Sequence, residues 1–252
     1  MLKSLFTGRQ LFITLLVLVG VGVLCRLGVW QLDRLAQRHA QNALIDGRLA
    51  APPVPLTGAP IAPDALEYRR VEVRGVYDET QEIVLRNRAL DGVPGVHLIT
   101  PLRLNGSGAA VLVDRGWIPL EQSSPEQRRA FAVSGQAVVQ GVARLSQEST
   151  FGPVDPPLGP DRPRLDAWFR VDIPRIQQQV GYPLLPVFVE LQPAPGDPGL
   201  PRREATIDLG EGPHLGYALQ WFSFAIILLA GYLALVVKRE RVHPAAAPNQ
   251  AG

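Results

Sequence analysis

Two long apolar runs, one near each end of the chain, dominate the pattern of hydrophobic and polar positions. The first covers residues 11–25 (LFITLLVLVGVGVLC) and the second covers residues 217–237 (YALQWFSFAIILLAGYLALVV), and neither contains a charged residue. The second run has the roughly 20 residues that a helix needs to cross a bilayer. The first reaches that length when it continues to Trp30, with Arg26 near its end, where a long cationic side chain reaches the headgroups. The pattern predicts two transmembrane helices, over residues 11–30 and 213–237.

A cleavable signal peptide is the alternative interpretation of the first run. Lys3 and Arg9 precede it, as basic residues precede the apolar part of a signal peptide. However, no small-x-small cleavage site follows Cys25, where the sequence reads RLGVWQL. The sequence therefore favours an uncleaved anchor.

The charges of the two short tails predict an orientation. Residues 1–10 carry Lys3 and Arg9 and no acidic residue, and residues 238–252 open with Lys-Arg-Glu-Arg. Basic tails stay on the cytoplasmic side of a membrane. We therefore expect a multi-pass protein of a bacterial inner membrane, with residues 31–212 in the periplasm.

Residues 31–212 show the short alternating segments of a β domain. Gly75 interrupts the alternation of the first segment and predicts a bulge, and residues 105–108 (NGSG) predict a hairpin turn. The predicted strands cover residues 68–77, 81–88, 96–104, 109–118, 136–145 and 184–191. Short helices are predicted at 125–132 and 173–180, and loops at 51–64, 152–163 and 193–201. The expected fold is a meander closed into a small, mainly antiparallel barrel or sandwich.

Composition and charge narrow the classes of function. A net charge of +2 gives no reason to expect a nucleic-acid partner. Cys25 is the one cysteine, so the β domain has no internal disulfide and depends on packing. The chain has no P-loop, GxSxG, HExxH, CxxC or CxxCH motif, and with one cysteine and one methionine it is a poor candidate for copper handling. Asp114 and Arg115 are interpreted as a structural pair.

Polar and aromatic residues gather at the inner ends of the apolar runs. They share one face of each predicted helix: Arg26, Trp30, Asp33 and Arg34 on the first, and His214, Tyr217, Ala218 and Trp221 on the second. An aromatic belt at the membrane interface explains Trp30 and Tyr217. The belt explains less well why a histidine and arginines should face a common cleft. These residues suit a haem, because its iron can bind the imidazole and its propionates can bind the guanidiniums.

Five short blocks, in this order along the chain, are similar to the signature of a known family. The first is residues 27–35 (LGVWQLDRL), which resembles a G-x-W-Q-x-x-R signature. The others are residues 68–77 (YRRVEVRGVY), 94–102 (PGVHLITPL), 113–119 (VDRGWIP) and His214-Leu215-x-Tyr217 with Trp221. Together with the terminal helices, these blocks resemble the Surfeit-locus-1 (Shy1-like) family of cytochrome c oxidase assembly factors. The chain departs from the family at Asp114, where an asparagine is expected.

The resemblance implies a non-enzymatic factor that helps to place haem a in the catalytic subunit of a haem–copper oxidase. It implies His214 as the haem-linked residue and metal ligand, and Tyr217, Trp221, Arg26, Trp30 and Arg34 remain candidates for binding the cofactor. The implied partners are that catalytic subunit, haem a synthase and the lipid bilayer.

Two other functions remain open. The first is a structural adaptor without cofactor, for which Ala230 and Ala234 offer a helix-packing face. The second is an envelope enzyme with a pocket in the β domain.

Overall fold

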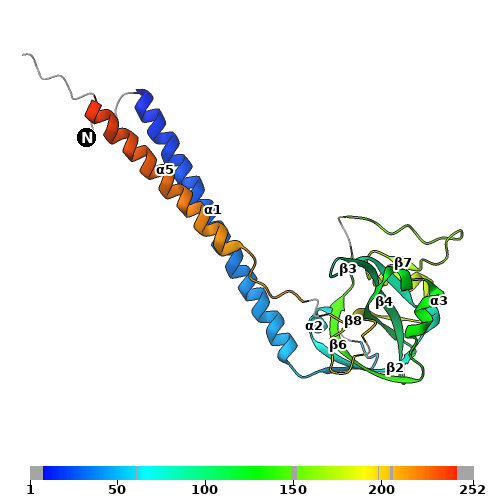
Figure 1. Cartoon of the computed structure of the whole chain (residues 1–252). Helices are drawn as coiled ribbons and strands as arrows, with labels where there is room; N and C mark the ends of the chain where they lie inside the picture. The colour runs from blue at the N-terminus through cyan, green and yellow to red at the C-terminus, as the bar shows by residue number, and fades with distance from the viewer. Residues whose placement is uncertain (1–7, 61, 149–151, 198, 205–206, 243–252) are drawn as a thin grey trace, which may run out of the picture. The chain divides into compact units, whose positions relative to one another are not determined.

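The computed structural model describes residues 8–60, 62–148, 152–197, 199–204 and 207–242 (Figure 1). The chain divides into two compact units. The helix unit comprises Met1–Ala43 and Leu209–Gly252, and the β unit comprises Leu44–Asp208.

Two long helices form most of the helix unit. They are α1, Gly8–Ala50, and α5, His214–Val242. Both are long and apolar enough to cross a membrane, and only 11% of the most apolar window of each is buried, which is unlike the core helix of a soluble domain. The structure therefore confirms two apolar terminal helices that flank a β domain. The helix α1 continues 20 residues past Trp30, the predicted end of the first membrane span; the span itself stays a prediction.

The contact between α1 and α5 follows a heptad spacing. Positions 10, 14, 17, 21, 24, 28, 31, 35 and 38 of α1 are all buried or half-buried, in the alternating steps of four and three of a coiled coil. Thr14 makes a hydrogen bond with Tyr232, and Gln10 accepts one of 3.0 Å from Arg239 Nη1. The α1 residue with the lower number pairs with the α5 residue with the higher number, so the two helices are antiparallel.

Small residues bring the two helices close together. A Cβ atom on Gly28 would lie 2.7 Å from the ring of Phe222. On α5 the buried alanines are Ala218 and Ala225. The alanines that the sequence proposes as a packing face, Ala230 and Ala234, are exposed and take no part in this contact.

The β unit is a mixed barrel of five strands with three further strands attached. The barrel runs β2, β6, β8, β5, β4 and closes where β4 pairs with β2, while β1, β3 and β7 lie outside this ring. The strands are β1 Val54–Leu56, β2 Arg70–Tyr77, β3 Ile83–Leu90, β4 Val93–Leu104, β5 Ala110–Pro119, β6 Gln136–Leu145, β7 Ala167–Trp168 and β8 Leu184–Leu191.

The topology differs from the expected meander. Strands β3, β4 and β5 follow one another as antiparallel neighbours, but β6 returns to pair with β2, and β8 enters between β6 and β5. The pair β5–β8 is parallel, as are β1–β2 and β3–β7. The six predicted strands are present, and β1 and β7 are additional.

Gly75 closes the barrel and does not form a bulge. The register of β2 with β6 runs without a shift from Arg70 to Val76. Gly75 also pairs with Leu104 of β4, and a Cβ atom there would collide with the carbonyl oxygen of Arg103. The glycine therefore permits a close approach of two backbones.

The core of the β unit is apolar and lies inside and beside the barrel. One cluster fills the barrel with residues such as Val71, Val73 and Val189, and a second surrounds the fully buried Trp168. The short helices of the β unit are α2 Pro63–Leu66, η2 Glu79–Gln81, η3 Leu120–Gln122, α3 Pro125–Arg128, η4 Arg129–Phe131, α4 Ile173–Ile176 and η5 Gln177–Gln179. The two predicted short helices are confirmed as α3–η4 and α4–η5.

Candidate functional site

A histidine–glutamine pair joins the two helices at the start of α5. His214 Nδ1 lies 2.9 Å from Gln31 Oε1, and both side chains are half-buried. The other ring nitrogen, Nε2, lies beside Gly212, where a Cβ atom would be 3.5 Å away. Gly212 has a φ of 72°, in the left-handed region that favours glycine. His214 thus has one ring nitrogen held by α1 and the other beside a position without a side chain.

The segment that enters α5 is bound along α1. Arg38 Nε donates to the carbonyl oxygen of Gly210 at 2.9 Å, and Asn42 Nδ2 donates to that of Leu209 at 2.6 Å. These bonds hold the chain just before His214, so the position of the imidazole is fixed from both sides.

The candidate residues on α1 share a face, as predicted, but that face is not the one that contacts α5. Arg26 and Arg34 are exposed, and the Trp30 side chain is 45% exposed. The Arg34 guanidinium lies 6.0 Å from the centre of the Trp30 ring and also donates to Gln37 at 3.0 Å. Within the described residues, no polar or ring contact joins these three side chains to His214.

The candidate residues on α5 divide between its contact face and its exposed side. His214 and Ala218 lie against α1, whereas Tyr217 is 48% exposed. Trp221 is half-buried and meets the Phe224 ring edge-on, with centroids 6.1 Å apart. The structure therefore joins His214 to Gln31, which sequence reasoning did not select, and among the described residues no side-chain hydrogen bond joins the other five candidates to His214.

A second group of polar side chains lies inside the β unit around Arg115. The register of β4 with β5 shifts at Leu98–Ile99, which leaves Arg115 as the extra residue of a bulge. Arg115 Nη1 lies 3.2 Å from Glu82 Oε2 and 3.3 Å from Glu79 Oε2, and Nη2 donates to the carbonyl oxygen of Phe131. One buried guanidinium thus links the bulge to two other segments, residues 79–82 and residues 129–131.

The expected pair of Asp114 and Arg115 is not formed. Asp114 accepts a hydrogen bond of 3.0 Å from the backbone nitrogen of Gly116 and faces His97 Nδ1, also at 3.0 Å. Neighbouring side chains on a strand point to opposite faces, so the two charges find separate partners. Gly116 has a φ of 116°, and a Cβ atom there would lie 2.6 Å from the Arg202 carbonyl oxygen. Its role is one of backbone geometry.

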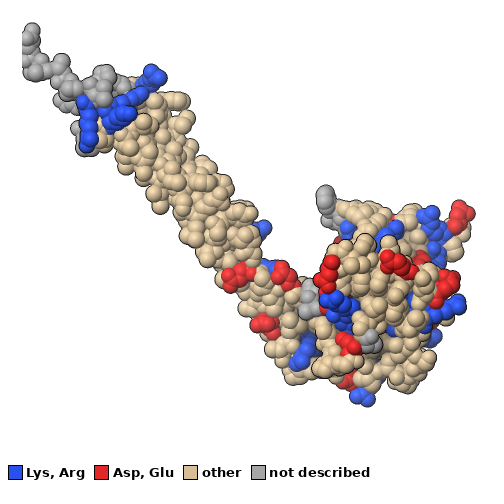
Figure 2. Space-filling model, in the orientation of Figure 1, with Lys and Arg blue, Asp and Glu red and all other residues tan. Residues whose placement is uncertain are grey.

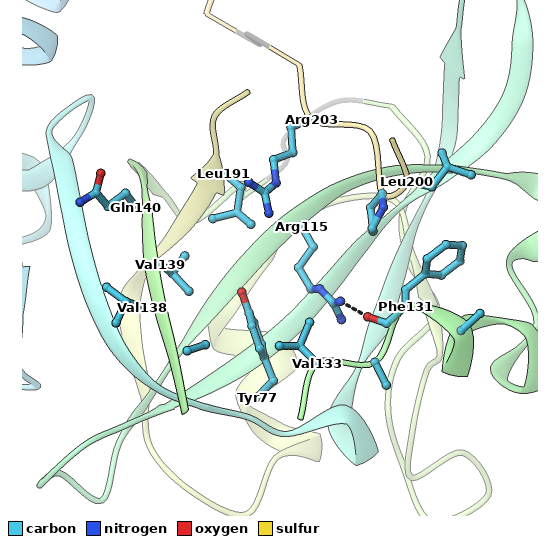
Figure 3. Close-up of a pocket in the computed structure, with 14 residues that line it drawn as sticks. Tyr77, Arg115, Phe131, Val133, Val138, Val139, Gln140, Leu191, Leu200 and Arg203 are labelled. Atoms are coloured by element: carbon cyan, nitrogen blue, oxygen red, sulfur yellow. Dashed lines mark hydrogen bonds between the residues drawn. The ribbon is translucent and has the colours of Figure 1, made fainter. Parts of the chain in front are cut away.

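A cavity of about 390 Å³ lies beside Arg115 (Figure 3). Figure 3 shows the Tyr77 hydroxyl and the Arg203 side chain pointing into it from different sides, with Val139 and Leu191 on its wall. Burial raises the pKa of Tyr77 to about 12, although the charge of Arg115 opposes the shift.

Burial also raises the pKa of Glu82, against the hydrogen bond from Thr100 and the charges of Arg115 and Arg128. Shifted pKa values beside a cavity are what an enzyme site would show. Structural ion-pair networks shift them too, and each polar contact of Arg115 links separate parts of the fold. The arrangement supports a structural role.

Comparisons with known proteins identify the family. Residues 18–226, which are more than half of the chain, match the model of the SURF1 family. The chain belongs to the SURF1 family. Surfeit locus protein 1 of Takifugu rubripes is 30% identical over 234 residues, which cover 86% of this chain and 93% of that protein.

Two further relatives show the same extent of similarity. The SURF1-like protein of Monosiga brevicollis is 29% identical over 220 residues, covering 83% of this chain and 82% of the relative. Surfeit locus protein 1 of Mus musculus is 29% identical over 213 residues, covering 78% of this chain and 66% of the mouse protein. The SURF1 match includes both His214 and Arg115, so both groups of residues belong to the part shared with the family.

Within the described residues, no three His, Cys, Asp or Glu side chains are grouped so that they could hold a metal ion.

Proposed function

We propose that this chain is a membrane-anchored assembly factor that helps to place haem a in the catalytic subunit of a cytochrome c oxidase. The observation that carries this proposal is the SURF1 match over residues 18–226, which takes in most of α1, the whole β unit and the first half of α5. The role is non-enzymatic: the chain handles a cofactor or a subunit and leaves its chemistry unchanged.

In this proposal His214 holds the haem iron transiently. A haem iron accepts a single axial imidazole from the protein, so one histidine is sufficient. His214 fits this requirement because its Nε2 lies beside Gly212, which has no side chain to block an approach. A site with one protein ligand binds less tightly than a closed pocket with two, and a donor must release its cargo.

The other candidate residues lie on α1 and α5 outside the His214–Gln31 contact, and in the proposal they bind the periphery of the haem. Arg26 and Arg34 are exposed on one face of α1 and offer guanidiniums to the propionates. Trp30, Tyr217 and Trp221 offer aromatic surface at the same ends of the helices.

The proposed location is a bacterial inner membrane, with the β unit in the periplasm. Figure 2 shows Lys and Arg at the end of the helix pair where α1 begins and α5 ends, next to a long surface without charge. Arg9, Lys238, Arg239 and Arg241 are exposed at this end, as the positive-inside rule expects of a cytoplasmic end. The proposed partners are the oxidase catalytic subunit, haem a synthase and the lipids.

A deletion strain complemented with plasmid-borne variants tests the proposal. Deletion should lower oxidase activity and the haem a absorbance of isolated membranes, while haem synthesis and the oxidase polypeptides remain. The wild-type chain should restore both signals and His214→Ala should not. His39→Ala is the matched control, because His39 is an exposed histidine whose pair with Glu211 contributes little.

Each outcome selects one function. Normal, fully haemylated oxidase in the deletion strain would reject the assembly role and favour an envelope enzyme. Restoration by His214→Ala would reject the ligand role and favour the adaptor, which the exposed Ala230 and Ala234 would serve.

A further inference from the structure

Gln31 occupies a position where a polar side chain needs a partner. It lies on the heptad stripe of α1, is half-buried, and meets His214 across the contact with α5. A polar residue at such a position costs stability unless it is hydrogen-bonded. The pair is therefore a specific feature of the helix contact, and its chemistry decides the state of the histidine.

The contact with Gln31 favours one position for the proton on the neutral His214 ring. Gln31 Oε1 is an amide oxygen, which only accepts hydrogen bonds, and it faces Nδ1 at 2.9 Å. Nδ1 therefore donates, and in the neutral ring Nε2 keeps its lone pair. That lone pair is on the side of Gly212, where no side chain competes for it.

We propose that Gln31 is a positioning residue that holds His214 in the Nδ1–H tautomer, with Nε2 presented as a metal ligand. This inference rests on the proposed function for the identity of the metal, a haem iron. A ligating histidine usually donates its second N–H to such an acceptor, which fixes the ring and raises the basicity of the ligating nitrogen. Gln31 is this acceptor, and it lies on the neighbouring helix. His214 is therefore held in the ligating tautomer only when α1 and α5 are in contact.

The haem-free protein gives the first test. In the full-length chain in detergent micelles, ¹⁵N chemical shifts of the imidazole report which nitrogen is protonated, and His214→Asn identifies the signals. The wild type should show Nδ1 protonated. Gln31→Leu removes the acceptor at similar volume and should give the mixture of tautomers typical of a free neutral histidine. An unchanged Nδ1–H tautomer in Gln31→Leu would overturn the proposal without involving haem.

Titration with ferric haem b, followed by its Soret band, gives the second test. Loss of such a second partner weakens metal binding by about 10- to 100-fold, so Gln31→Leu should raise the Kd by that factor. Gln31→Glu provides a stronger acceptor and should raise the iron–imidazole stretching frequency of the reduced complex. Gln41→Leu, at an exposed glutamine of the same helix, is the matched control and should bind as the wild type does.

The variants separate a failure of this inference from a failure of the proposed function. If His214→Ala loses the haem and Gln31→Leu keeps a wild-type Kd, then His214 is the ligand and the positioning role is wrong. If His214→Ala binds haem as well as the wild type, the ligand assignment fails and the role of Gln31 fails with it.

Discussion

The two units of this chain bury polar groups by different means. In the β unit whole charges are buried, and each guanidinium is shared by several oxygens, as Arg115 is by Glu79, Glu82 and Phe131. In the described part of the helix unit no charged side chain is buried. The half-buried part of its helix contact uses neutral pairs, Thr14 with Tyr232 and Gln31 with His214, and the charged Arg239 joins Gln10 at an exposed position.

The difference follows from what surrounds each unit in the proposed setting. A protein domain in water gathers charges into satisfied networks, whereas a helix pair in lipid associates through close packing and a few neutral hydrogen bonds. Changes to buried charges should therefore destabilise the β unit. Changes at the helix contact should separate the helices or disturb His214 and leave the β unit folded.

The largest effect is expected from Arg115→Leu. Removing one partner of a buried ion pair leaves the other charge without compensation, which costs about 3–5 kcal/mol. In this variant the remaining cation paired with Glu82 is Arg128, whose Nε lies 3.5 Å from the Glu82 carboxylate. Urea unfolding of the full-length chain in detergent, followed by the near-ultraviolet circular dichroism of the β-unit aromatics, should show this loss.

Arg129→Leu is the control, because Arg129 is exposed and lies next to Arg128 in the sequence. It should change the free energy of unfolding by less than about 0.5 kcal/mol. Equal effects of the two variants would show that the Arg115 network does not stabilise the fold.

A smaller effect, confined to the helix unit, is expected from Gly28→Val. The Cβ atom would lie 2.7 Å from the Phe222 ring, so the ring must move or the helices must separate. Overpacking of this kind costs about 1–3 kcal/mol, or about 5- to 150-fold in an equilibrium. The ¹⁵N shifts of His214, whose Nδ1 meets Gln31 across the contact, report whether the helices stay together and should move toward those of a free histidine.

The matched control is Gly22→Val, since a Cβ atom on Gly22 meets nothing within 4 Å. This variant should leave the His214 shifts unchanged. Unfolding of the β unit should be unaffected by either valine. If Gly28→Val lowered the stability of the β unit instead, the separation of the two units proposed above would be wrong.

Local pattern was sufficient to predict most of the elements. The six strands with a clear alternation are all present, and β8 begins and ends where expected, at Leu184 and Leu191. The missing strands, β1 and β7, have three and two residues. Segments this short carry no readable period, and the first lies in a stretch rich in proline and glycine.

Pairing over long distances could not be predicted. A return of β6 to β2, or the parallel entry of β8, depends on closing a barrel, and an alternating strand fits several neighbours equally well. Gly75 illustrates this limit, because an interrupted alternation indicates a bulge as readily as a close approach. The structure shows a close approach, between the backbones of Gly75 and Arg103.

The candidate site was predicted in part for a similar reason. Helical spacing correctly placed Arg26, Trp30 and Arg34 on one face of α1, but it does not show which face meets another helix. The polar and small residues at positions 10, 14, 28 and 31, which fall on one heptad stripe, carried that information. Applied together with the position of His214, it would have selected Gln31.

The smallest effect is expected from Tyr182→Phe, and it should depend on pH. Burial alone would raise the pKa of Asp78, but hydrogen bonds from Thr80 and from the Tyr182 hydroxyl outweigh it and lower the pKa. The bond from Tyr182 is 2.9 Å long. A carboxyl group with a lowered pKa stabilises the fold above its unfolded pKa of about 3.9, and this contribution is lost as the pH falls through the folded pKa.

Removing the hydroxyl should therefore cost about 1 kcal/mol at pH 7, which is less than the roughly 1.5–3 kcal/mol of a bond to a charged group because solvent screens the partly exposed Asp78. The difference from the wild type should shrink as Asp78 becomes protonated below pH of about 4. Tyr68→Phe is the matched control: the Tyr68 ring is also stacked against an arginine, Arg144 at 5.0 Å, as Tyr182 is against Arg103 at 4.7 Å. Within the described residues the Tyr68 hydroxyl makes no hydrogen bond, so its loss should be small at every pH. A Tyr182→Phe cost that stayed constant from pH 7 to pH 3 would mean that the hydroxyl acts through packing and that the charge of Asp78 is not involved.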